Sequence, residues 1–118
     1  MMFDDNTPIF LQLIDIMQNC IIRGEWKEGE KVPSVREVAM AYEVNPKTVV
    51  KAFDVLSSRE IVIKKRGMGF YLAEHAKQNI MDELQKEFMQ TQLPKFIADI
   101  KRLELSPEKV ADLIRNSN

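Results

Sequence analysis

Three groups of polar and basic residues in the middle of the chain have the types and spacing of a surface that binds polyanions. They are Ser34 with Arg36, the string 45–48, and the basic run 64–66. Lysine and arginine side chains donate to phosphates and to base edges, and the free N–H groups at a helix N-terminus attract anions. Residues 31–72 therefore predict double-stranded DNA as a partner.

Ser34 marks the expected start of one of the helices that position these groups. Glu37 follows at the capping-box spacing, and Pro33 discourages an earlier helical turn. Apolar residues then repeat at helical spacing and define a buried face, which comprises Val35, Val38, Ala39 and Tyr42. Arg36 falls on the opposite face, where it is either a solvated side chain or a DNA contact.

A second helix is predicted to begin at Pro46, with Asn45 as its N-cap. Its buried stripe comprises Val49, Ala52, Phe53 and Leu56. Lys47, Thr48 and Lys51 then face outward near the N-terminus, where a helix in the major groove contacts base edges. A solvated polar face is the plainer interpretation of the two lysines.

A β-hairpin with basic residues at its turn is predicted next. Residues 61–63 and 70–72 are β-branched and aromatic runs, and the two glycines between them allow a tight turn. Lys65, Arg66 and Gly67 are expected to contact phosphates as a wing. The alternative is a charged edge that only prevents aggregation.

These elements predict an α+β, mostly α chain with two parts. Residues 1–73 form a winged helix-turn-helix domain, and residues 74–118 form a small C-terminal helical dimerisation segment. The domain opens with a helix that Asn6 or Thr7 can cap, and its buried stripe comprises Phe10, Leu13, Ile14, Met17 and Ile21.

The C-terminal segment is predicted to be helical over residues 76–104, where Pro94 either kinks one helix or begins another. Ser106 and Pro107 open a last helix. A segment this short cannot build much of a core alone, so its apolar stripe is expected to form a two-fold interface. The stripe comprises Ile80, Leu84, Phe88, Ile97 and Ile100. Truncation after Ala73 is then expected to leave a folded monomer that binds DNA weakly.

The order and spacing of the motifs resemble the DNA-binding domain of the GntR family of bacterial transcription regulators. The resemblance covers residues 8–72 and rests on Pro8-Ile-Phe-Leu-Gln-Leu, Gly24-Glu-Trp, Gly29-Glu-Lys-Val-Pro-Ser-Val-Arg-Glu-Val-Ala, Val44-Asn-Pro-Lys-Thr-Val and Arg66-Gly-Met-Gly-Phe-Tyr-Leu. The short tail and the Asn-Pro-Lys-Thr-Val string are most similar to the YtrA subfamily.

This resemblance implies a role for each group of residues. Ser34 would contact phosphate and Arg36 a base, while Asn45, Lys47 and Thr48 would lie at the front of the recognition helix. Arg66 and Gly67 would form the wing tip. Two positions depart from the family: many relatives have arginine where this chain has Pro46, and a helix-ending glycine is usual where it has Glu60.

Charge and composition narrow the function further. The net charge is −1, but residues 21–72 carry ten bases and seven acids, an excess of +3. One cysteine excludes an intrachain disulfide and fits a reducing compartment, and no apolar run has membrane-spanning length, so we expect a cytoplasmic protein that does not enter the membrane. With one histidine, no phosphate-binding loop and no metal-ligand cluster, neither an enzyme nor a cofactor or metal site is expected.

The sequence thus favours a homodimeric transcriptional regulator, a repressor that binds a pseudo-palindromic operator. The alternative is a winged-helix protein–protein interaction module, in which neutralising Arg36, Lys47 and Arg66 would not affect DNA binding. A small-molecule effector, if one acts, is expected between subunits or between the tail and the DNA-binding head, because the tail is too short to enclose it.

Overall fold

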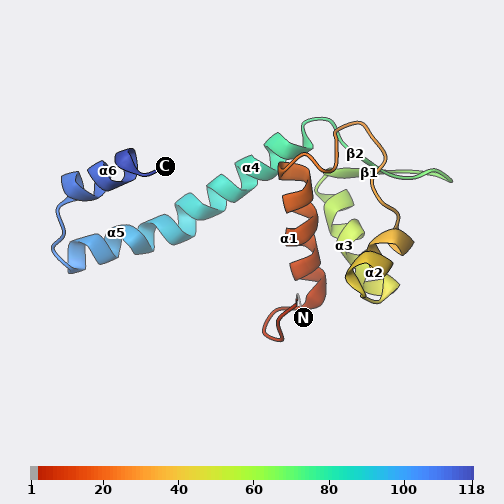
Figure 1. Ribbon diagram of the computed structural model, residues 1–118, viewed down its shortest axis with the longest axis horizontal. Coiled ribbons are helices and arrows are strands. Elements are labelled where there is room, and N and C mark those ends of the chain that lie inside the picture. The colour runs from red at the N-terminus through yellow and green to blue at the C-terminus, as the bar shows by residue number, and fades with distance from the viewer. Residues whose placement is uncertain (1–2) are drawn as a thin grey trace. The chain divides into compact units, whose positions relative to one another are not determined.

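The computed structural model describes residues 3–118 (Figure 1). The chain divides into two compact units, one that ends at Met81 and one that begins at Asp82. The first unit, called the head below, carries three helices and a two-stranded wing, and the second, called the tail, is helical. This confirms the predicted class, a mostly helical winged helix-turn-helix with C-terminal helices.

The first helix, α1 (Ile9–Ile22), packs against α3 (Pro46–Ser58) of the head. Four residues of its predicted stripe are buried, and Phe10 is half-buried. The predicted cap was wrong. Pro8 occupies the N-cap position without a side-chain cap bond, and the N–H groups of Asn6 and Thr7 donate to Asp4 Oδ1 in a turn before the helix.

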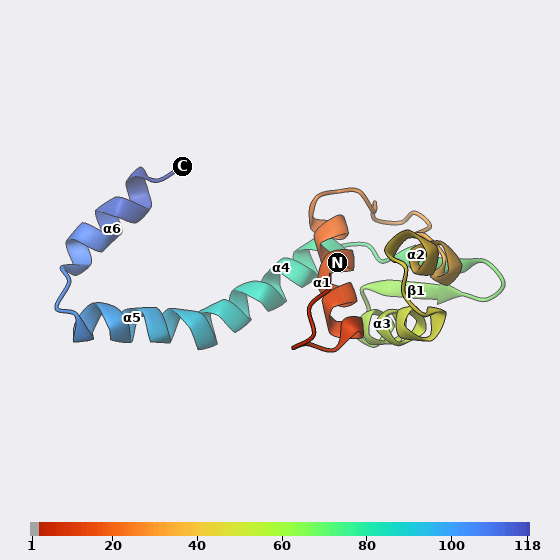
Figure 2. The same cartoon turned by 60° about the horizontal axis from the view of Figure 1, so that its bottom comes forward.

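Helices α2 (Val35–Tyr42) and α3 (Pro46–Ser58) form the helix-turn-helix. They pack against each other, and β1 packs against α3, as Figure 2 shows. The turn between the helices passes through Glu43, which has a left-handed φ of 54°. The four residues of the predicted α3 stripe are all 0% exposed, so the core anchors one complete face of this helix.

The wing consists of β1 (Val62–Lys65) and β2 (Gly69–Leu72), paired antiparallel. Its strands run closer to the tip than the sequence predicts, and the turn is correspondingly shorter. Phe70 stacks on Phe53 of α3 with ring centroids 4.4 Å apart, and Trp26 stacks on the same ring at 6.3 Å. The contact between Phe70 and Phe53 joins the wing to α3.

Helix α4 (Ala76–Glu87) starts in the head and continues into the tail. Its first two turns pack into the head core, where Ala76 is 0% and Ile80 is 2% exposed. Glu28 accepts a hydrogen bond from the Lys77 N–H at 3.2 Å and so caps the helix from a distant loop. The head therefore ends later than Ala73, and Ile80 belongs to its core instead of the expected two-fold interface.

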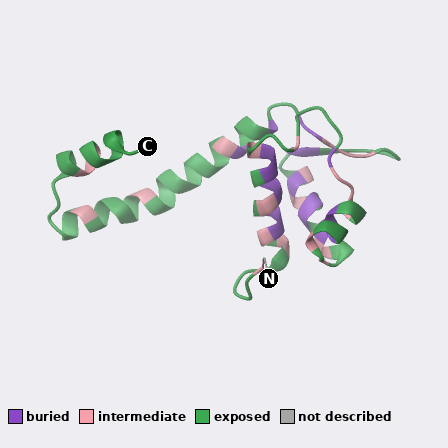
Figure 3. Cartoon of the chain, viewed as in Figure 1, coloured by how far each residue is buried: buried purple, intermediate pink, exposed green. Residues whose placement is uncertain are grey.

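The tail adds η1 (Phe88–Gln92), α5 (Leu93–Arg102) and α6 (Pro107–Asn116). A π-helical turn precedes Pro94, and such a turn accommodates the missing proline N–H without a break in the helix. Ser106 caps α6 through the Lys109 N–H, as predicted. None of η1, α5 and α6 has a buried residue, as the colouring of Figure 3 shows. Among the described residues, no helix is long and apolar enough to cross a membrane.

Candidate nucleic-acid interface

The start of α2 carries the first group of predicted contacts. Ser34 Oγ accepts from the Glu37 N–H at 3.1 Å, and the Glu37 carboxylate accepts from the Ser34 N–H at 3.0 Å. The capping box predicted from the sequence is therefore confirmed. Because Oγ acts as the acceptor in this cap, the Ser34 hydroxyl still has a proton, which it can donate either to the Glu37 carboxylate or to a phosphate.

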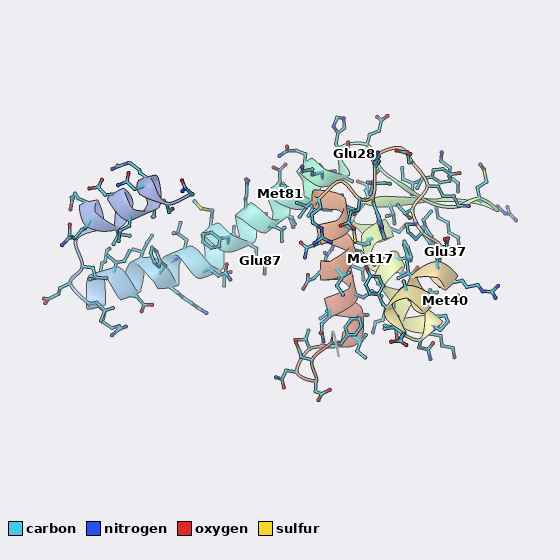
Figure 4. All side chains as sticks on the ribbon, in the orientation of Figure 1. Met17, Glu28, Glu37, Met40, Met81 and Glu87 are labelled. Carbon is cyan, nitrogen blue, oxygen red and sulfur yellow. The ribbon has the colours of Figure 1, made fainter. Side chains whose placement is uncertain are left out.

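Glu37 remains charged within this cap. The hydrogen bond from the Ser34 backbone N–H, with a smaller effect of the Ser34 hydroxyl, lowers the pKa of the Glu37 carboxyl below its ordinary value. A carboxylate in the first turn also suits the positive end of the helix dipole. Figure 4 shows Glu37 on α2, with Met40 further along the same helix.

Arg36 projects from α2 beside this cap. It is exposed, and it makes no hydrogen bond or ion pair within the described residues 3–118. Some of the other arginines are paired: Arg23 with Glu25 at 2.6 Å, and Arg102 with Asp99 at 3.3 Å. An unpaired guanidinium has its planar set of donors available for bidentate binding to a guanine edge or a phosphate.

The start of α3 carries the second group. Asn45 Oδ1 accepts from the Lys47 N–H at 2.8 Å, and Pro46 follows as the first helical residue, both as predicted. This cap occupies the carbonyl of the Asn45 side chain and leaves its amide group as a donor. Lys47 is exposed and Thr48 is half-buried, so the lysine extends further toward any ligand at this helix end.

Lys51 is positioned differently from a freely solvated lysine. Its Nζ lies 4.0 Å from the centroid of the Phe10 ring of α1, within cation–π range. Phe10 therefore orients an exposed cation of α3. Sequence reasoning had assigned Phe10 to the core only, since helical periodicity contains no information on contacts between α1 and α3.

The register of the wing separates its cations. Lys64 lies opposite Phe70, on the sheet face that contacts Phe53, with Nζ 5.9 Å from the Phe70 ring. Lys65 lies on the other face, with Nζ 4.2 Å from the Tyr71 ring. Arg66 is exposed in the turn that follows. The basic run predicted as one group thus presents charge on both faces of the hairpin and at its tip.

Gly67 and Gly69 give the wing tip its shape. Gly67 has a φ of 74° and Gly69 a φ of 95°, conformations that favour glycine. A Cβ at Gly69 would lie 3.0 Å from Lys31 Cε. The missing side chain therefore leaves room for Lys31 to extend along the wing.

Lys31 is a further basic residue at this site that the sequence did not single out. It pairs with Tyr71 in an isolated antiparallel bridge, so it lies at the edge of β2, next to the face that carries Tyr71 and Lys65. Its charge also helps to lower the pKa of Glu37, although the two hydrogen bonds of Ser34 have larger effects. Lys31 therefore joins the wing to the start of α2. Its place just before the Val-Pro-Ser string was the available signal.

Comparison with known proteins agrees with this geometry. Residues 11–72 match the model of the family described as bacterial regulatory proteins, gntR family. The chain belongs to the GntR family of transcriptional regulators. Members of this family are transcription regulators and not enzymes. The resemblance noted in the sequence is therefore confirmed.

Full-length similarity supports the same assignment. YhcF of Bacillus subtilis, an uncharacterized HTH-type transcriptional regulator, is 34% identical over 113 residues, covering 96% of this chain and 92% of the relative. YtrA of Bacillus subtilis, an HTH-type transcriptional repressor, is 36% identical over 110 residues, covering 93% and 84%. A GntR family regulator from Listeria monocytogenes has a similar structure, with a TM-score of 0.79 and 30% identity over 98% of this chain and 100% of that chain. The regulator is thus YtrA-like over nearly its whole length.

Proposed function

We propose that this GntR regulator is a homodimeric repressor in the cytoplasm, whose two heads bind one pseudo-palindromic operator and block promoter access. The main support is the pair of unpartnered cations, Arg36 and Lys47, at the starts of two helices that pack together. The similarity to YtrA, which is named a repressor, supports repression over activation.

Direct readout is assigned to Arg36, with Lys47 and Thr48 beside it, while Ser34 and Asn45 donate to phosphates. Arg36→Ala should cost ~1–3 kcal/mol of operator binding and relax the preference at one base pair. Affinities for the protein's own upstream DNA and for single-mismatch variants test this by mobility shift. Arg102→Ala is the matched control, because it removes an exposed arginine of the tail.

Two results would contradict the assignment. Equal weakening of Arg36→Ala on operator and mismatched DNA would reduce Arg36 to a phosphate contact. Unchanged DNA binding after Arg36, Lys47 and Arg66 are all neutralised would indicate a protein–protein interaction module instead.

The wing is proposed to supply affinity that does not depend on sequence. The wing tip is proposed to contact the phosphates of the DNA backbone through Lys65, Arg66 and Gly67. The donors are the two basic side chains and the main-chain N–H groups of the turn. Lys31 and Lys64 extend this positive surface along the two faces of the hairpin. This arrangement supports a wing whose two faces both contact phosphates of the DNA.

The tail is proposed to pair with the tail of a second copy. Its large apolar side chains have no core to enter: Phe88 is 48%, Phe96 is 47% and Leu103 is 55% exposed. Leu84, Gln85, Phe88 and Met89 line an open apolar groove of about 430 Å³ that suits a partner's side chain. With seven acids and six bases, residues 82–118 do not strongly repel a copy of themselves. The interface is assigned to Leu84, Phe88, Ile97 and Ile100, with Met89 and Phe96.

Sedimentation of the full-length protein tests the pairing. The wild type should sediment as a dimer and Phe88→Asp as a folded monomer, because a charge in the centre of the apolar surface would be buried unpaired. Leu11→Asp, on an exposed position of α1, is the control and should remain dimeric. Footprints of the dimer should show half-site centres ~10 bp apart or a multiple. A monomeric wild type would rule out this assembly.

A further inference from the structure

Val50 is an exposed aliphatic side chain on the recognition helix α3. It is 43% exposed, whereas Val49 and Ala52 on the core face of the helix are 0% exposed. Pro46 and Asp54, one turn before and after Val50, are also exposed, as is Lys47. Val50 therefore belongs to the outward side of the helix, at a position where the core does not require a hydrophobic residue.

The neighbouring residues offer few hydrogen-bond donors for reading bases. Pro46 has neither an N–H nor a polar side chain, and the Lys51 ammonium lies over the Phe10 ring. The structure describes the whole of α3, and Lys47 is the exposed cation of this helix that does not lie over an aromatic ring. The outward side of α3 thus combines one free cation, Lys47, with an apolar surface made by Val50 and Pro46.

We infer that Val50 is a specificity-determining residue that packs against the C5-methyl group of a thymine in each operator half-site. The thymine methyl is the apolar group that the major-groove edges of the bases present, and small apolar side chains recognise it by contact. A valine in a helix has essentially one χ1 rotamer, so its two methyl groups are held in place before DNA binds. This inference rests on the proposed DNA-binding function and specifies one of the bases that the regulator reads.

The expected effect is modest and measurable. Burying one methyl group corresponds to ~0.8 kcal/mol, which is about fourfold in affinity. Because a two-fold dimer repeats the contact in each half-site, removing both thymine methyl groups should weaken binding by about fifteenfold.

The test uses full-length protein and an operator selected from random-sequence DNA. Each thymine is replaced singly by deoxyuridine, which lacks the 5-methyl group but keeps the same hydrogen bonds. Fluorescence anisotropy then gives the affinity of the wild type, Val50→Ala and Val50→Thr for each duplex. Leu11→Ala is the matched control, because Leu11 is 39% exposed but lies on α1.

One thymine per half-site should show the effect. Its replacement should cost the wild type and Leu11→Ala about fourfold, Val50→Thr less, and Val50→Ala almost nothing. The inference is overturned if no deoxyuridine substitution weakens the wild type, or if every substitution costs the wild type and Val50→Ala equally. Val50→Thr keeps the β-branched shape of valine, so it measures the coupling to each thymine independently if Val50→Ala does not fold.

This experiment also separates the two levels of the argument. If the wild type selects no sequence from random DNA, the proposed sequence-specific function fails and the thymine contact fails with it. If the wild type selects an operator but shows no coupling between Val50 and a thymine, only the thymine contact is overturned.

Discussion

Truncation of the chain at two nearby points should give opposite results. A fragment ending at Ala73 contains every element of the winged helix-turn-helix, and the sequence suggested that it would fold. The structure places Ala76 and Ile80 of α4 in the head core, at 0% and 2% exposed. We therefore expect residues 1–81 to fold as a stable monomer and residues 1–73 to be strongly destabilised.

The magnitude follows from what the shorter fragment loses. An isoleucine side chain moved from a core to water costs ~1.5–3 kcal/mol, and the cavity that it leaves adds to this cost. Loss of the hydrogen bond between Glu28 and the Lys77 N–H contributes ~1 kcal/mol. The sum, ~3–5 kcal/mol, is a large part of the ~4–12 kcal/mol expected for a domain of this size.

Urea unfolding followed by tryptophan fluorescence measures this loss. The chain has one tryptophan, and Trp26 stacks on Phe53 in the head, so its emission reports the core directly. With a urea dependence of ~1 kcal/mol per M, the midpoint of residues 1–73 should lie at least ~3 M below that of residues 1–81.

A pair of single substitutions controls for the length of the fragments. In a fragment that ends at Glu87 and so completes α4, Ile80→Ala should cost ~2–4 kcal/mol, whereas Leu84→Ala, one turn further along and 40% exposed, should cost less than ~1 kcal/mol. Equal midpoints for the two truncations, or equal costs for the two alanines, would refute the assignment of α4 to the head core.

Three other perturbations test separate contacts. Arg66→Ala should reduce the magnitude of the slope of log K against log salt by about 1, and an unchanged slope would place the side chain away from DNA. Phe10→Leu should weaken operator binding by about twofold to fivefold because it releases Lys51, and an equal loss in a Lys51→Met background would exclude that cause. Glu37→Gln tests the cap of α2. The Ser34 backbone hydrogen bond lowers the pKa of Glu37, so the ionised carboxylate stabilises the folded state. This contribution to the free energy of unfolding is complete above the ordinary pKa of about 4.3 and is lost as pH falls through the lowered pKa. The stability gap between wild type and variant should therefore shrink between pH 6 and pH 3, and a constant gap in urea midpoints would contradict the pKa shift.

The features predicted correctly from the sequence are those that depend on neighbours in the chain. The capping box at Ser34, the Asn45-Pro46 helix start and the buried stripe of α3 each require only residues within a few positions of one another. The wing was also predictable, since a β-branched run and an aromatic-rich run flank the two glycines. Its exact register was not, because cross-strand pairing and the contact of Phe70 with Phe53 determine where the strands end.

The features that the sequence did not reveal depend on contacts between distant segments. Helical spacing placed Ile80 on an apolar stripe. The stripe does not specify whether residues of the same domain or of a second subunit cover Ile80, which the structure places in the head core. The same holds for Phe10, whose ring lies beneath the Lys51 ammonium, and for Lys31, which reaches the wing beside Gly69. Each residue was classified by its own chemistry, and its role depends on a partner far away in the chain.

The basic excess of residues 21–72, which hold the helix-turn-helix and the wing, is modest, and this gives the proposed pairing through the tail a role in DNA binding. With +3 over residues 21–72, one head neutralises few phosphates, and counterion release from so few contacts gives weak binding at physiological salt. Two linked heads combine their contacts, because the second binds at the high effective concentration that the first creates. In the proposed dimer, weak individual heads would depend on the tail for occupancy of an operator, and single heads would dissociate readily from unrelated DNA. On this argument, the exposed apolar surface of the tail is as necessary for operator recognition as the side chains of α2 and α3.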